Sequence, residues 1–144
     1  MSLPSTKQVI AISQSSTTNA ATASGNIDTL GYKFLSIDVI TSTSNAVSNK
    51  PTVLKLSQSD TTVVSTFADI SGAVGGSDFT IADAVTSGDW GSKFNVSLVG
   101  KKRYIKISVS PLTTQIITAI ANLSKGDVSP ASATEVNVKN VINV

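Results

Sequence analysis

The stretch FNVSLVGKKRYIKISV, residues 94–109, alternates apolar and polar side chains on either side of a basic centre. A period of two is typical of β-strands that bury one face. A four-residue loop, Gly100–Arg103, would join two such strands as an antiparallel hairpin with Leu98 opposite Ile105. This register is favoured because it buries six apolar side chains together, namely Phe94, Val96, Leu98, Ile105, Ile107 and Val109.

The basic centre is the densest positive charge in the chain, because Lys101, Lys102 and Arg103 are consecutive. A position at the tip of a hairpin accounts for this basic cluster, and no bound ligand is needed to explain it. Gly100 readily adopts an unusual backbone angle, and cationic side chains at a tip stay hydrated. Nucleic-acid binding would need a wider positive face and exposed aromatic rings for base stacking. Only 5% of the residues are aromatic and Tyr104 alone adjoins the cluster, so we do not expect nucleic acid as a partner.

Strand-like patterns recur along the chain, most clearly where Leu35, Ile37 and Val39 alternate with other residues. Turn-rich segments separate them, which is typical of a sandwich. A helix over QIITAIANL is disfavoured by its β-branched residues, and a single helical turn near Ala82 is left open. We therefore predict an all-β fold, an antiparallel β-sandwich that is jelly-roll-like, as a single domain with extended terminal segments. The expected strands are residues 8–13, 35–40, 52–57, 61–66, 79–81, 94–99, 103–110 and 114–123.

The C-terminal stretch VNVKNVINV, residues 136–144, reads as a final strand or arm. We expect a sandwich domain over residues 1–130, N-terminal segment included, and a separate arm over residues 131–144, because Pro130 and a small polar run loosen the connection. The arm could complete its own sheet or add to an open edge of a neighbour, and we favour the neighbour. Its candidate partner contacts are Val136, Val138, Val141 and Val144.

The amino-acid composition excludes several kinds of catalytic and metal-binding site. The 144 residues include no cysteine and no histidine, which removes disulfides, thiolate nucleophiles and the usual zinc ligands, and leaves a serine nucleophile without its common base. Charged residues are 14%, against about 25% in typical domains, and the net charge is +2. A surface of hydroxyls and amides opposes association only weakly. We expect no enzyme activity and no cofactor.

The chain also lacks the features of a membrane protein. Its start has no cationic region followed by a sustained apolar run, and no stretch approaches the roughly 20 apolar residues that span a bilayer. We expect a soluble protein made in the cytoplasm, with no membrane partner.

Two further groups of residues admit a functional and a structural interpretation. Asp78, Asp83 and Asp89 could be imagined as calcium ligands, but they lack the dense oxygen spacing of a calcium loop, so loop capping is favoured. Trp90, between two glycines, could stack on a sugar, although a partly buried anchor in a loop is favoured.

Four segments, taken in order, resemble a family of small virion proteins of tailed bacteriophages and prophages. They are IDTLGYKFLSIDVI (residues 27–40), TVLKLSQSD (52–60), FADISGAVGG (67–76) and GKKRYIKISVSP (100–111). The resemblance spans residues 27–123 and supplies no catalytic residue. The chain departs from the family pattern in its reduced acidic turn, SQSD, and in its C-terminal tail.

This resemblance implies a structural role in the virion, most simply as a capsid decoration or cement protein. Such a protein would be made in the host cytoplasm, bind the major capsid protein across capsomers on the head surface, and form a homo-oligomer, with a trimer favoured. The alternatives are a neck, tail or fibre component, and a carbohydrate-binding module on the particle surface that would use Trp90 and Tyr32.

Overall fold

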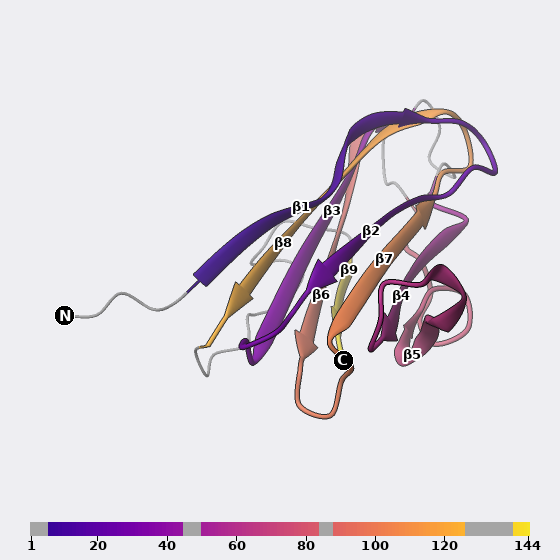
Figure 1. Ribbon diagram of the computed structural model, residues 1–144. Coiled ribbons are helices and arrows are strands. Elements are labelled where there is room, and N and C mark those ends of the chain that lie inside the picture. Colours follow the sequence, from indigo (N-terminus) through magenta and orange to yellow (C-terminus); the bar gives the residue numbers. More distant parts are fainter. Residues whose placement is uncertain (1–5, 45–49, 84–87, 126–139) are drawn as a thin grey trace.

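The computed structural model describes residues 6–44, 50–83, 88–125 and 140–144, and these fold into two stacked β-sheets (Figure 1). A five-stranded sheet has the order β1-β8-β3-β6-β9, and a four-stranded sheet has the order β2-β7-β4-β5. The strands are β1 (Thr6–Thr17), β2 (Ala23–Asp28), β3 (Phe34–Ser44), β4 (Val53–Ser59), β5 (Ala68–Val74), β6 (Gly88–Ser97), β7 (Tyr104–Ser110), β8 (Gln115–Ser124) and β9 (Asn140–Asn143).

The pairing is nested: β1 pairs with β8, β2 with β7, β3 with β6, and β4 with β5, all antiparallel. Eight strands wrapped in this way into two sheets form a jelly roll. The predicted all-β, jelly-roll-like sandwich is therefore confirmed. The described residues contain one 3₁₀ turn, Val64–Thr66, and no helix that is long and apolar enough to cross a membrane.

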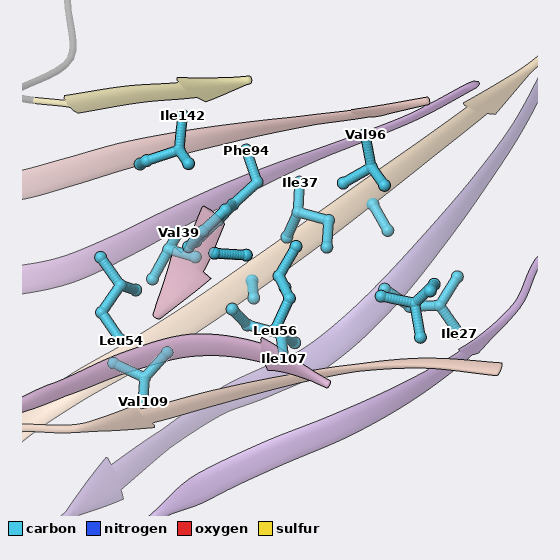
Figure 2. Packing of buried hydrophobic residues seen from close by; sticks show 14 of the residues in the cluster. Ile27, Ile37, Val39, Leu54, Leu56, Phe94, Val96, Ile107, Val109 and Ile142 are labelled. Carbon is cyan, nitrogen blue, oxygen red and sulfur yellow. The ribbon is translucent and has the colours of Figure 1, made fainter. Parts of the chain in front are cut away.

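The core lies between the two sheets, because each sheet turns its alternate apolar side chains inward. Figure 2 shows Ile37 and Phe94 from the five-stranded sheet pointing toward Leu56 and Ile107 from the four-stranded sheet. All four side chains are fully buried. Inward-facing positions of two packed sheets interdigitate in this way across about 10 Å, so the period-two pattern of the sequence marks the faces that meet.

The predicted hairpin over residues 94–109 is wrong in its pairing, although its six apolar residues do turn toward the core. Strand β6 pairs with β3 and β9, whereas β7 pairs with β2 and β4 in the opposite sheet. The loop between them crosses from one sheet to the other. Two inward-facing strands satisfy the same alternation whether they are neighbours in one sheet or face each other across a core.

Two predicted strands are not formed. Residues 61–66 form a loop that ends in the 3₁₀ turn, with Val64 75% exposed. The Thr66 hydroxyl organises this loop by donating to the Val63 carbonyl (2.7 Å) and bonding the Ser59 hydroxyl (2.6 Å). Side-chain bonds of this kind compete with a sheet ladder. Of residues 79–81, Phe79 makes one isolated bridge to Gly75.

Strands β2 and β5 were not predicted, because their sequences, ASGNID and ADISGAV, are small, polar and glycine-containing. Such sequences score poorly as strands. Tertiary pairing overrides this preference: β2 lies beside β7, which supplies its ladder partners, and β5 lies beside β4.

The C-terminal strand β9 pairs in parallel with β6 of its own chain. Backbone bonds continue past it, with the Val144 amide donating to the Asn95 carbonyl (2.8 Å) and the Ser97 amide to the Val144 carbonyl (2.7 Å). Ile142 is buried in the core. The expectation that the tail adds to a neighbour is therefore wrong for Asn140–Asn143. The division at residue 130 lies outside the described residues.

Candidate functional site

The outer face of the five-stranded sheet carries the strongest candidate site, and it has two parts. Along β3, residues Leu35, Ile37 and Val39 point into the core, so the intervening side chains point outward. Strand register places these outward positions in rows with those of the neighbouring strands. One end of the face is a neutral groove, and the other end is an exposed apolar patch.

The groove crosses all five strands and has a volume of about 580 Å³. We call it the amide groove. The residues that line it carry amide, hydroxyl, aromatic or aliphatic side chains, and none of them ionises. The lining side chains used below are Phe34, Ser36, Asn95, Ser97, Asn122 and Asn143.

Its floor is a row of neutral polar residues in register across four strands. Asn122 lies opposite Ser36, Ser36 opposite Asn95, and Asn95 beside Asn143. The Asn95 amide nitrogen Nδ2 donates to Asn143 Oδ1 at 3.0 Å. Asn95 is only 6% exposed, yet its Oδ1 has no hydrogen-bond partner among the described residues, and the same holds for Ser36 Oγ.

The apolar part, which we call the isoleucine patch, consists of Ile10, Ile40, Ile116 and Ile120. Ile10 lies directly opposite Ile120. On the same face, Ile40 is the diagonal neighbour of both Ile120 and Ile116. Ile10 is 66% exposed, Ile40 47% and Ile116 39%. Three strands therefore contribute large apolar side chains to one exposed surface.

On β3 and β6 a charge pair stands beside the groove, in the same row as Ile120 of the patch. Lys93 Nζ lies 2.8 Å from Asp38 Oδ1, and the two residues are opposite one another on β6 and β3. Asp38 stands one outward position from Ser36 on one side and from Ile40 on the other. Because the two charges neutralise each other, neither part of the face presents a net charge.

The predicted hairpin tip is a crossing loop whose cations are mostly paired. Gly100 has a φ of +74°, as its position predicted, and Lys101 is half-buried. Lys102 Nζ lies 3.6 Å from Asp60 Oδ2, and Arg103 binds Asp28 through Nε (3.0 Å) and Nη2 (2.8 Å).

Arg103 also changes the titration of its partner. Its two hydrogen bonds, assisted by the Leu30 backbone amide, lower the pKa of Asp28 from 3.8 to about 2 despite opposing desolvation. The same bonds raise the pKa of Arg103. A guanidinium held in this way is engaged with protein and not presented to a phosphate, which agrees with a structural role for the cluster.

The carboxylates considered as calcium ligands are dispersed. Asp78 Oδ2 accepts the Gly72 and Val74 backbone amides at 2.7 and 3.1 Å, so its predicted role as a loop cap is confirmed. Asp83 forms an ion pair with Lys50 at 2.9 Å. The Asp89 side chain lies outside what the structure describes. Within the described part of the chain, no cluster of three or more metal-ligating residues occurs.

The two aromatic residues considered for sugar stacking are not both available. Trp90 is fully buried, and its Nε1 donates to the Ala82 carbonyl at 2.8 Å, so stacking on a ligand is excluded and the anchor role is correct. It lies within β6, not in a loop. Tyr32 is half-buried and packs against the core.

The candidate contacts of the C-terminal tail have mixed outcomes. Val141 and Val144 are half-buried at the edge of the five-stranded sheet, and their role as partner contacts stays a prediction. Val136 and Val138 lie outside the described residues.

Sequence reasoning missed the amide groove altogether. Its members stand at the polar positions of period-two strands, where a solvated face is the ordinary expectation. Asn122 and Asn95 stand in one row, on either side of Ser36, but they are 27 positions apart in the chain, so only the strand order brings them together. The outward isoleucines Ile40 and Ile116 are a sequence signal for the patch, since they interrupt the alternation.

No protein-family model and no curated protein sequence matches the chain. Among solved structures, the chain is similar to the SPBc2 prophage-derived protein YomS, at 11% identity and a TM-score of 0.42, over 85% of this chain and 96% of that one. It is similar to a structure of the infectious bursal disease virus Gx strain, at 17% identity and a TM-score of 0.44, over 88% of this chain and 33% of that one.

A structure described as CBM4 is equally similar, at 13% identity and a TM-score of 0.40, over 88% of this chain and 71% of that one. The chain is thus weakly similar to a prophage protein, to a viral protein and to a carbohydrate-binding module alike. Likenesses this weak support no argument about function, and a sandwich of this kind hosts many unrelated functions.

Proposed function

We propose that this chain is a structural virion protein of a tailed bacteriophage, a decoration or cement protein that attaches to the major capsid protein across capsomers. The observation that carries the proposal is the isoleucine patch. Large apolar side chains gathered on one exposed face mark an interaction surface, whereas single exposed apolar residues are common and need no explanation.

The surroundings of the patch favour a protein partner. Asp38 beside it is already paired with Lys93, so docking would bury no unmatched charge. The chain carries few charges and a net charge of only +2, which weakly opposes packing of many copies on one shell. The sequence resemblance to small virion proteins, spanning residues 27–123, supports the same partner.

We further propose that the copies form trimers at threefold or quasi-threefold points on the outside of the head. Attachment would then be stabilised by the surface area buried against the shell, and no catalytic step would be involved. A neck, tail or fibre position is the alternative within the same particle, and copy number separates the two. A copy number comparable with that of the shell subunit supports decoration, and a few copies per particle support the neck or tail.

The attachment face is tested by replacing Ile10 and Ile40 together by serine. Both side chains are exposed, so we expect the free energy of unfolding to change by about 1 kcal/mol or less. Binding to expanded capsids that lack the chain should fall strongly in co-sedimentation.

The matched control is the pair Val63→Ser and Val64→Ser, two exposed apolar residues of the loop before β5. It should bind capsids as the unaltered chain does. Full binding by the isoleucine variant, or equal loss in the valine variant, would show that the patch is not the attachment face.

A further inference from the structure

We propose that the amide groove binds a neutral carbohydrate, lying across the five strands as a short run of sugar units. This inference goes beyond capsid attachment and uses different residues of the same sheet face. It begins with an unpaired group: Asn95 is nine-tenths buried, its Nδ2 is committed to Asn143, and its Oδ1 has no partner among the described residues.

A second unpaired group stands directly opposite the first. Ser36 Oγ, on β3, also has no partner within the described part of the chain. A buried polar atom left without a partner destabilises the fold. Both atoms are shielded by their surroundings, so a small rotation of either side chain is needed before a hydroxyl bound in the groove can pair with it.

The chemistry of the walls narrows the ligand. The lining contains hydroxyls and carboxamides and no ionisable side chain, and the charges of Asp38 and Lys93, one outward position away on β3 and β6, neutralise each other. An anionic or cationic ligand would therefore be desolvated without a counter-charge. A pure hydrocarbon would match the largely apolar exposed lining of the groove but would leave Asn95 and Ser36 unsatisfied. A neutral ligand that carries hydroxyl groups meets both conditions.

The remaining wall fits the apolar side of such a ligand. Phe34 lines the groove from β3 and is half-buried, so part of its ring is available to a ligand. Sugars present hydroxyls along their edges and C–H groups on their faces, which suits a site with polar groups beside an aromatic ring. The volume of about 580 Å³ falls within the roughly 300–1,000 Å³ of small-molecule sites.

The test uses the full chain and a panel of neutral cello-, xylo-, manno- and galacto-oligosaccharides, with acidic galacturonic oligomers as the charge comparison. We expect at least one neutral series to bind and to shift the amide NMR signals of Ser36, Asn95 and Asn122. Acidic oligomers should bind more weakly or not at all.

Two variants locate the binding. Ser36→Ala removes an unpaired hydroxyl, so it should leave the melting temperature unchanged or raised while weakening the oligosaccharide affinity about tenfold. Asn122→Ala, from the same row, should weaken the affinity as well. The matched control is Ser16→Ala on β1, an exposed serine of the same face outside the groove, which should bind normally.

Several results would overturn the inference: no binding by any neutral series, equal binding of acidic oligomers, or equal weakening by Ser36→Ala and Ser16→Ala. Binding of uncharged peptides in place of sugars at the same residues would also overturn it. Because none of these variants replaces a residue of the isoleucine patch, capsid attachment is expected to persist in all of them.

Discussion

At the scale of single residues, the pair Asp28–Arg103 joins the end of β2 to the loop that enters β7. The guanidinium makes two bonds to the carboxylate, and the Arg103 carbonyl accepts both the Thr29 amide (3.0 Å) and the Thr29 hydroxyl (2.6 Å). Arg103 was expected from the sequence at a solvated tip. Its partner, 75 positions earlier, became visible only in the fold.

This pair predicts a dependence of stability on pH. The folded pKa of Asp28 is lowered to about 2, so its contribution is present above the unfolded value near 4 and is lost as the pH falls toward 2. Asp28→Asn removes that contribution. Between pH 5 and pH 2, the melting temperature of Asp28→Asn should therefore fall less than that of the unaltered chain.

The control for this experiment is Asp60→Asn, because Asp60 has a single, longer contact with Lys102 at 3.6 Å. Its pH profile should follow the unaltered chain. If Asp28→Asn shows the unaltered slope across this range, the bidentate pair does not act in solution.

At the scale of elements, the edge strands β1 and β2 approach each other where the two sheets meet. A Cβ atom built on Gly25 would overlap the carbonyl oxygen of Ala11 on β1. The register of β1 against β8 shifts between Ile10 and Ile12, on either side of that carbonyl. A glycine is therefore required in β2 by close backbone approach, and the sequence ASGNID looks weak as a strand for a packing reason.

Gly25→Ala tests this contact. The added methyl group meets backbone atoms, which cannot rotate away, so we expect a loss of about 1–3 kcal/mol or more in the free energy of unfolding. Urea denaturation gives the measurement. Ser24→Ala, at the exposed neighbouring position, should change it by less than about 0.5 kcal/mol. Equal stability of both variants would mean that the strands do not approach this closely.

At the scale of the whole molecule, the nested pairing of the jelly roll decides which strands are neighbours. Strands β4 and β5 pair with each other, whereas β6 and β7 follow one another in the chain and lie in different sheets. The connection between them passes over one end of the core. Both outer faces are thereby built from segments that are distant in sequence, the amide groove among them.

Engineered cysteine pairs distinguish this topology from the simple hairpin, and the chain offers a background without cysteine. Ser97 lies opposite Phe34 in the five-stranded sheet, a separation that a disulfide can bridge. Phe34→Cys with Ser97→Cys should therefore crosslink on mild oxidation, as shown by mass spectrometry.

The comparison variant shares one of these cysteines. A hairpin with Leu98 opposite Ile105 would place Ser97 opposite Lys106, but in the fold these residues belong to different sheets. Ser97→Cys with Lys106→Cys should thus remain reduced within the monomer. Efficient crosslinking of this second pair, without the first, would show that β6 and β7 pair as a hairpin and would contradict the sandwich topology.

By itself, the sequence determined which faces of the main strands are buried. Residues 35–39, 94–98 and 105–109 alternate as predicted, and Gly100 takes the positive φ that its position required. These features are local, because the side-chain period of a strand and the backbone freedom of glycine do not depend on distant partners. The absence of histidine and cysteine likewise limited the chemistry of any site before the fold was known.

Only the tertiary structure decided which strands are neighbours, and with them the candidate site. The alternation of apolar and polar residues predicts that Phe94 and Ile107 face a core, which they do. This pattern is identical whether the two residues lie in one sheet or face each other across the sandwich. Asn95, Ser36 and Asn122 each read as solvated positions until strand order aligned them in one row. The tail strand β9 also found its place in its own sheet through long-range contacts, since Ile142 is buried only where β6 and the opposite sheet enclose it.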